Sequence, residues 1–132
     1  MPISEKHKLA FCHVPRTGGV SICNALKLTV VDRHFPASWF RKNYPDYFLF
    51  ATIRPYRERI ESAYGYKHPE RTESGIIKGM NNVGLMLKPD EYFIDTEVDF
   101  TIRFSHLNED LNTMLRQRGI KEVKLVQCNS FR

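Results

Sequence analysis

The chain has 132 residues, of which 42% are hydrophobic and 27% are charged. This length fits one domain over residues 1–132 and excludes a second catalytic domain, while the composition excludes a disordered or fibrous protein. The net charge of +5 favours an anionic partner such as a nucleotide, a nucleic acid, a sulfated glycan or an anionic membrane surface, without choosing among them.

The first predicted unit is a strand, a glycine turn and a helix. Leu9–Val14 is an almost unbroken apolar run that stops at Pro15, which is typical of a strand covered on both faces. Gly18 and Gly19 follow, and the apolar residues of Val20–Leu26 recur at helical spacing. These features predict a strand that leads through a tight turn directly into a helix.

A second unit of the same kind lies near the middle of the chain. Tyr47–Ile53 is apolar throughout and predicts another strand, followed at once by a helix that Pro55 opens. A short helix is expected over Pro36–Asn43, between the two units. The inner stripe of the second helix is predicted to consist of Ile60, Ala63 and Tyr64.

The rest of the chain is expected to complete the sheet. Lys67–Asp90 is polar and dotted with glycine, and it predicts mobile surface structure with one helix near Val83–Leu87. The elements expected after it are a strand over Val98–Phe104, a helix over Asn108–Arg118 closed by Gly119, and a last strand over Val123–Gln127. Strands that alternate with helices predict an α/β fold, a mostly parallel sheet flanked by helices.

The cysteines and the N-terminal sequence indicate the cellular compartment of the protein. Cys12, Cys23 and Cys128 form no CxxC pair, and their odd number leaves at least one unpaired, which favours a reducing compartment. The apolar run near the N-terminus is about six residues long, shorter than the 7–15 residues or so of a signal-peptide core. No run approaches the roughly 18 apolar residues of a membrane span. We therefore predict a cytoplasmic, soluble protein.

The first strand-to-helix junction has the composition of a phosphate-binding loop. Gly18 and Gly19 let the backbone approach a ligand closely, and the amides of the helix N-terminus point toward that ligand. Arg16 adds a permanent positive charge, and Thr17 and Ser21 add hydroxyl donors to the same rim. The alternative is a tight turn that only ends the strand. The loop does not match GxxxxGK[ST], which disfavours a nucleoside-triphosphatase loop.

The second junction carries an arginine at the end of a predicted strand. Arg54 and Ser62 are separated by about two helical turns, so the arginine side chain reaches far enough for both to share one phosphate. Ligands of α/β sheets bind at the ends of strands, which favours this function for Arg54. The alternative, an amphipathic helix with solvated ion pairs, is preferred for Arg57, Glu58 and Glu61.

Taken together, the junctions resemble the sulfotransferase superfamily. FCHVPRTGGVSI (residues 11–22) is similar to its 5′-phosphosulfate loop, and FLFATIRPYRERIESAY (residues 48–64) is similar to its 3′-phosphate motif, an arginine followed eight positions later by serine. RFSHLNEDLNTMLRQRGI (residues 103–120) looks like the family's strand-then-helix segment, and VQCNSFR (residues 126–132) looks like its late Asn-x-Ser-x-Arg loop. Only the first two motifs are specific.

The resemblance implies a P-loop-like sheet, a donor and a set of site residues. The donor is 3′-phosphoadenosine 5′-phosphosulfate (PAPS), and the acceptor is a hydroxyl group, for which the family favours a carbohydrate. The residues that the resemblance places at the 5′-phosphosulfate are Arg16, Thr17, Gly18, Gly19, Val20 and Ser21, with Arg54 and Ser62 at the 3′-phosphate and Ser130 and Arg132 in the late loop. His34 takes the position of the family's base, with an ordinary surface histidine as the alternative, and His13 is assigned to packing or to loop positioning.

The implied mechanism is in-line sulfuryl transfer. His34 takes the hydroxyl proton, while Arg16 and the loop amides stabilise charge on the departing 5′-phosphate. No metal is needed, and Asp95, Glu97 and Asp99 alternate as a solvated strand edge would.

The sequence departs from the family pattern at three points. Arg16 replaces the commonest lysine and cannot donate a proton at neutral pH, and Pro55 comes one place early. The chain also ends at Arg132, where many relatives continue with a helix, so it is either a minimal form or a fragment.

Three other functions stay open. A nucleotide-dependent phosphotransferase would share the loop but lacks its Lys-Ser/Thr ending. A nucleic-acid-binding module is disfavoured because the positive charges are scattered and no aromatic-rich recognition motif is present. A non-catalytic nucleotide-binding relative would explain both Arg16 and the chain end at Arg132. The acceptor is expected to contact Lys67–Asp90.

Overall fold

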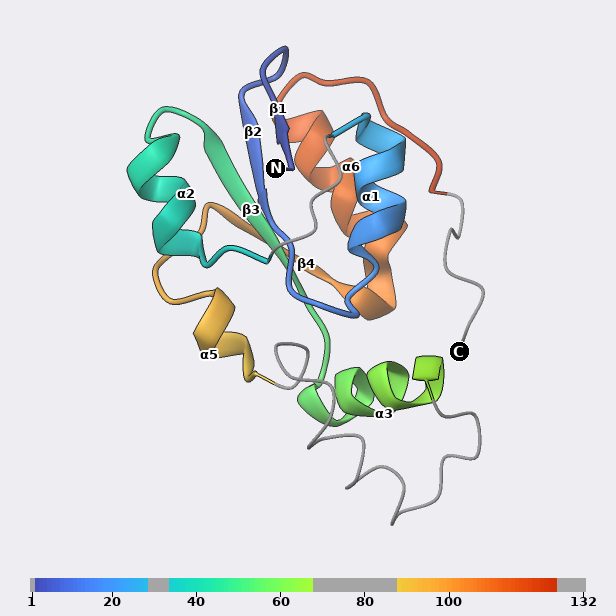
Figure 1. The fold of residues 1–132 in the computed structure, drawn as a ribbon. Coiled ribbons are helices and arrows are strands. Elements are labelled where there is room, and N and C mark those ends of the chain that lie inside the picture. Colours follow the sequence, from blue (N-terminus) through green and yellow to red (C-terminus); the bar gives the residue numbers. More distant parts are fainter. Residues whose placement is uncertain (1, 29–33, 68–87, 126–132) are drawn as a thin grey trace.

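A computed structural model describes residues 2–28, 34–67 and 88–125, and for residues 63–67 it describes the backbone only. Within these ranges the chain alternates short strands with helices (Figure 1). The strands are β1 (Ile3–Ser4), β2 (Leu9–Cys12), β3 (Phe48–Ile53) and β4 (Phe100–Arg103). The helices are α1 (Gly19–Leu26), α2 (Ala37–Asn43), α3 (Tyr56–Lys67), α5 (Asp90–Phe93) and α6 (Leu107–Gln117), and a 3₁₀ turn, η2 (Phe104–His106), precedes α6.

The strands form one sheet in the order β1-β2-β3-β4. β1 is antiparallel to β2, whereas the pairs β2–β3 and β3–β4 are parallel. In the parallel pairs Leu9 lies opposite Phe48, and Phe50 lies opposite Phe100. The predicted α/β class with a mostly parallel sheet is therefore confirmed.

Helices cover both faces of this sheet, and for this reason the sequence of β2 is apolar throughout. Successive side chains of a strand point to opposite faces. Leu9 and Phe11 join the core beneath α1 and α6, whereas Ala10 and Cys12 join the core beneath α2 and α5 (Figure 1). The first core also contains Ile22, Leu111, Met114 and Leu115, and the second contains Ala37, Phe40 and Phe93.

The parallel strands place three chain segments at one edge of the sheet. β2 continues through a loop into α1, β3 continues into α3, and β4 continues through η2 into α6. Because the carboxyl ends of parallel strands meet at the same edge, the segments beginning at His13, Arg54 and Phe104 lie together there. This edge holds the candidate site.

Most predicted elements are confirmed with slightly different bounds, and the exceptions have physical causes. The last strand is wrong for residues 123–125, which belong to no strand. Their polar groups pair with α6 instead: Asn112 donates to the Val123 carbonyl at 2.7 Å and accepts from the Val123 amide at 2.8 Å. β1 and the four-residue α5 were not predicted, because elements so short carry no periodicity. The helix expected near Val83–Leu87 lies outside the described residues.

The acidic residues before β4 do not form a strand edge, so that prediction is wrong. Asp95 accepts hydrogen bonds from the backbone amide and the hydroxyl of Ser38 at the start of α2. Asp99 pairs with Arg41 at 3.1 Å and accepts from the Leu49 amide at 2.8 Å. These carboxylates tie the segment before β4 to α2 and β3.

Cys12 and Cys23 are buried free thiols. Burial raises their pKa values to about 12 and about 11, so both thiols stay protonated at neutral pH. Among the residues that the structure describes, no helix is both long enough and apolar enough to cross a membrane.

Candidate functional site

The loop between β2 and α1 requires glycine at two successive positions. Gly18 is the N-cap of α1 and has a φ of 84°, a conformation that costs an L-residue about 1–2 kcal/mol. A Cβ atom on Gly18 would also overlap the Leu107 side chain, and one on Gly19 would overlap the His13 ring. The predicted glycine turn is therefore present, and α1 begins directly after it.

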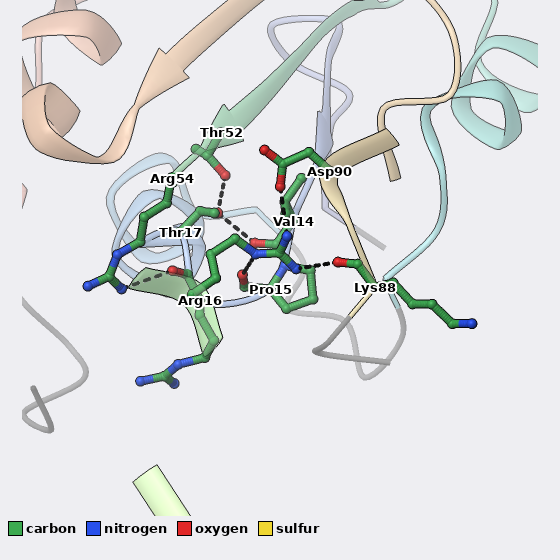
Figure 2. Close-up of polar contacts among 9 residues, drawn as sticks. Val14, Pro15, Arg16, Thr17, Thr52, Arg54, Lys88 and Asp90 are labelled. Atoms are coloured by element: carbon green, nitrogen blue, oxygen red, sulfur yellow. Dashed lines mark hydrogen bonds and ion pairs between the residues drawn. The ribbon is translucent and has the colours of Figure 1, made fainter. Parts of the chain in front are cut away.

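Thr17 does not lie on the rim where the sequence placed its hydroxyl. Its side chain is fully buried, donates a hydrogen bond to the Val14 carbonyl at 2.5 Å, and contacts the Thr52 hydroxyl (Figure 2). The buried hydroxyl is satisfied inside the protein and joins the loop to the end of β3. Ser21, in contrast, lines a cavity at this edge of the sheet.

Arg54 and Ser62 contact the first loop rather than each other. Arg54 Nη1 donates to the Arg16 carbonyl at 3.1 Å (Figure 2), and Ser62 Oγ accepts from Arg16 Nε at 3.0 Å. The Arg54 guanidinium also lies 3.8 Å from the centre of the Phe104 ring and 3.5 Å from Glu58. The two predicted phosphate-binding motifs therefore meet at Arg16.

These residues surround a cavity of about 420 Å³ at the carboxyl edge of the sheet. Arg16 and Arg54 give it positive charge, and no carboxylate lines it among the described residues. Phe104, Leu107 and Leu125 give it an apolar side. The complete described lining is His13, Pro15, Arg16, Gly18, Gly19, Val20, Ser21, His34, Arg54, Ser62, Phe104, Leu107, Asn108 and Leu125. A cavity with this charge and shape suits an anionic ligand that also has an apolar part.

His34 reaches this cavity and has a defined tautomer. Its Nδ1 lies 2.7 Å from the His13 carbonyl, which can only accept, so Nδ1 carries the proton and Nε2 keeps the lone pair. Burial lowers the pKa of His34 from its ordinary value of 6.5. Burial, with further contributions from His34 and Arg16, lowers the pKa of His13 to about 3. Both imidazoles are therefore neutral at pH 7, and His34 Nε2 can accept a proton.

Sequence reasoning missed several residues of the site. Phe104, Leu107 and Asn108 line the cavity because they follow the third parallel strand, a position that the strand order would have indicated. Arg59, which lies outside the lining of the cavity, is fully buried, whereas the sequence prediction covered only its neighbours Arg57, Glu58 and Glu61. The predicted solvated pair is present for Arg57 and Glu61, at 3.5 Å, whereas Glu58 pairs with the largely buried Arg54.

Other predicted residues lie outside the described part of the chain. Ser130 and Arg132, assigned to the late loop, belong to this group, as does most of the segment expected to contact the acceptor. Their functions stay predictions.

Comparison with known proteins does not identify a relative. Neither a scan against protein-family models nor searches of curated proteins and of solved structures found a significant match.

Proposed function

We propose that this chain is a sulfotransferase that binds PAPS and transfers its sulfuryl group to an acceptor hydroxyl, with a carbohydrate as the favoured acceptor. One observation carries the proposal: Arg16, Arg54, Ser62 and the glycine turn converge on one cavity at the carboxyl edge of a parallel sheet. The same residues form the two motifs that resemble the phosphate-binding segments of sulfotransferases.

The residues present fit such a nucleotide. The glycine turn and the N-terminus of α1 offer backbone amides to the 5′ end, in the manner of a P-loop, because the N-cap Gly18 has no side chain to cover them. Arg54 and Ser62 would hold the 3′-phosphate by charge-assisted hydrogen bonds. The apolar side formed by Phe104 and Leu107 suits a nucleobase.

The protein's own residues supply positioning, charge and a base. When bound, PAPS provides a sulfuryl group whose bond to the 5′-phosphate breaks as the acceptor oxygen bonds to sulfur. His34 Nε2 accepts the proton of the acceptor hydroxyl, and its Nδ1–H contact with the His13 carbonyl keeps the ring oriented. Arg16 stabilises charge on the departing 5′-phosphate but donates no proton at neutral pH.

A non-catalytic nucleotide-binding protein is the second candidate, because Arg16 stands where a proton-donating lysine is commonest. The cavity serves binding equally well in that case. A phosphotransferase is disfavoured: magnesium would need carboxylate ligands beside the phosphates, and the described lining of the cavity holds none.

The deciding experiment offers the protein radiolabelled PAPS together with a panel of carbohydrate, small-alcohol and tyrosine-peptide acceptors. We expect label on an acceptor and release of adenosine 3′,5′-bisphosphate, both lost in His34→Ala. A thermal-shift screen run in parallel compares adenosine 3′,5′-bisphosphate with ATP, GTP and NAD. Selective stabilisation by the bisphosphate without turnover of any acceptor would favour the non-catalytic candidate, and stabilisation only by ATP would contradict the proposal.

A further inference from the structure

Arg59 is the largest fully buried side chain in the described part of the protein, and it carries a charge. It lies in α3, and its side chain has no exposure to solvent. A buried guanidinium is retained only where a counter-charge and hydrogen-bond acceptors compensate for its lost hydration. The acceptors around Arg59 therefore show which chain segments it holds together.

The guanidinium of Arg59 binds three acceptors in two chain segments that are both distant in sequence from α3. Nε donates to the Pro15 carbonyl at 3.0 Å, Nη1 to Asp90 Oδ1 at 2.7 Å, and Nη2 to the Lys88 carbonyl at 3.0 Å. Figure 2 shows these acceptors surrounding one guanidinium. A planar fork of donors can satisfy three acceptors in fixed directions, which a lysine ammonium on a flexible stem does not reproduce.

The contact with Pro15 matters because of the residue that follows it. Arg16 has a φ of 61°, a left-handed conformation that residues other than glycine rarely adopt. The peptide groups before and after Arg16 each accept a hydrogen bond from an arginine. The Pro15 carbonyl accepts from Arg59, and the Arg16 carbonyl accepts from Arg54. The two guanidinium groups thus fix the peptides on either side of Arg16, whose side chain lines the cavity.

We propose that Arg59 is a positioning residue: it fixes the Pro15–Arg16 peptide so that Arg16 keeps its left-handed conformation and its place in the cavity, and Asp90 is the counter-charge that keeps Arg59 there. Asp90 is the first residue of α5, so the position of the loop between β2 and α1 depends on residues 88–90. The expected effect of Arg59 on nucleotide affinity rests on the proposed function, whereas its effect on the loop between β2 and α1 does not.

Hydrogen exchange of the unliganded protein tests the positioning directly. The variants are Arg59→Lys, which keeps the charge but loses the fork, and Asp90→Asn, which removes the counter-charge. Arg57→Lys is the matched control, because Arg57 lies two residues away on α3 with its side chain 80% exposed. Exchange is followed in peptides that cover residues 13–22 and, for comparison, residues 107–117 of α6.

We expect exchange in residues 13–22 to become about tenfold faster in Arg59→Lys, as loss of a charge-assisted hydrogen bond predicts, with α6 and the control unchanged. Asp90→Asn should show the same acceleration to a smaller extent. If Arg59→Lys does not fold, the exchange of Asp90→Asn tests the proposal in its place. Unchanged exchange in residues 13–22, or an equal acceleration in α6, would overturn the proposal.

A binding measurement separates this proposal from the proposed function. Arg59→Lys should weaken the affinity for adenosine 3′,5′-bisphosphate about tenfold, and Arg57→Lys should leave it unchanged. If the wild-type protein does not bind the nucleotide, the proposed function fails while the exchange result still decides the role of Arg59. If the wild-type protein binds and Arg59→Lys binds equally well, the positioning proposal fails and the proposed function stands.

Discussion

The Nε atom of Arg16 donates a hydrogen bond to Oγ of Ser62 at 3.0 Å. The sequence motifs assign this arginine to the 5′ end of a nucleotide and this serine to its 3′-phosphate. A ligand that carries both phosphates would therefore meet two cavity-lining residues that already contact each other. Binding at one end should be energetically coupled to binding at the other.

A double-mutant cycle measures this coupling. Arg16→Ala, Ser62→Ala and the double variant are titrated with adenosine 3′,5′-bisphosphate in a calorimeter. Because the two side chains touch, their effects on the binding free energy should deviate from additivity by about 0.5 kcal/mol or more. Additive losses within about 0.3 kcal/mol would show that the contact has no influence on binding.

Arg16 itself should matter more for turnover than for donor binding. If it stabilises charge on the departing phosphate, Arg16→Ala should lower kcat about 10²-fold or more, with a smaller loss of donor affinity. Arg16→Lys should keep or raise the activity, because lysine supplies the same charge and can also donate a proton. Steady-state kinetics checks both expectations; a folded lysine variant that binds donor without turnover would argue against the assigned function of the loop.

His34 is expected to act as the base. His34→Asn keeps a donor for the His13 carbonyl but has no basic nitrogen, so it should retain donor binding and lose about 10²–10⁴-fold in transfer rate. Since burial lowers the pKa of His34 from 6.5, the wild-type rate should be level at neutral pH and fall only in the acidic range below pH 6.5. A near wild-type rate in His34→Asn would leave the histidine with an orienting role only.

The neutral histidines also predict how stability depends on pH. His13 has a pKa of about 3 in the folded protein and an ordinary value of 6.5, so between these values the unfolded chain binds more protons. The free energy of unfolding should therefore be highest above about pH 6.5 and fall by up to about 1.4 kcal/mol per pH unit toward pH 3. Urea unfolding from pH 4 to pH 8 measures this slope. His13→Gln should flatten it, and a slope parallel to wild type would assign the effect to other groups.

Most of the fold could be predicted from residue patterns. The buried strands β2 and β3 appear as continuous apolar runs, and Gly18 marks the end of the first loop because its positive φ and the nearby Leu107 side chain favour glycine. β1 and α5 could not be predicted, since two and four residues carry too little periodicity. The strand expected at Val123 was wrong because the backbone of Val123 pairs with the side-chain amide of Asn112. This is a tertiary contact for which the local sequence gives no signal.

The site was predictable in its location but less so in its contacts. The motifs indicated Arg16, Arg54 and Ser62, and the parallel order of β2 and β3 brings them to one edge. The sequence did not reveal that Thr17 turns inward or that Arg59 is buried. No local sequence pattern distinguishes a threonine or an arginine at the surface from one in the core. Such residues are identified by the acceptors around them, which only the folded chain defines.

We expect the cavity to recognise a nucleotide through a 3′-phosphate as well as a 5′ group. Isothermal titration of adenosine 3′,5′-bisphosphate and adenosine 5′-monophosphate tests it most directly, with Arg54→Ala as the site variant and Arg57→Ala as an exposed control. A charge-assisted contact is worth about 1.5–3 kcal/mol, so the bisphosphate should bind about tenfold more tightly or better. Arg54→Ala should abolish this preference, because it removes the guanidinium assigned to the 3′-phosphate, whereas Arg57→Ala should change the affinity for neither nucleotide. Equal affinities of the wild-type protein for the two nucleotides would show that the cavity has no site for a 3′-phosphate.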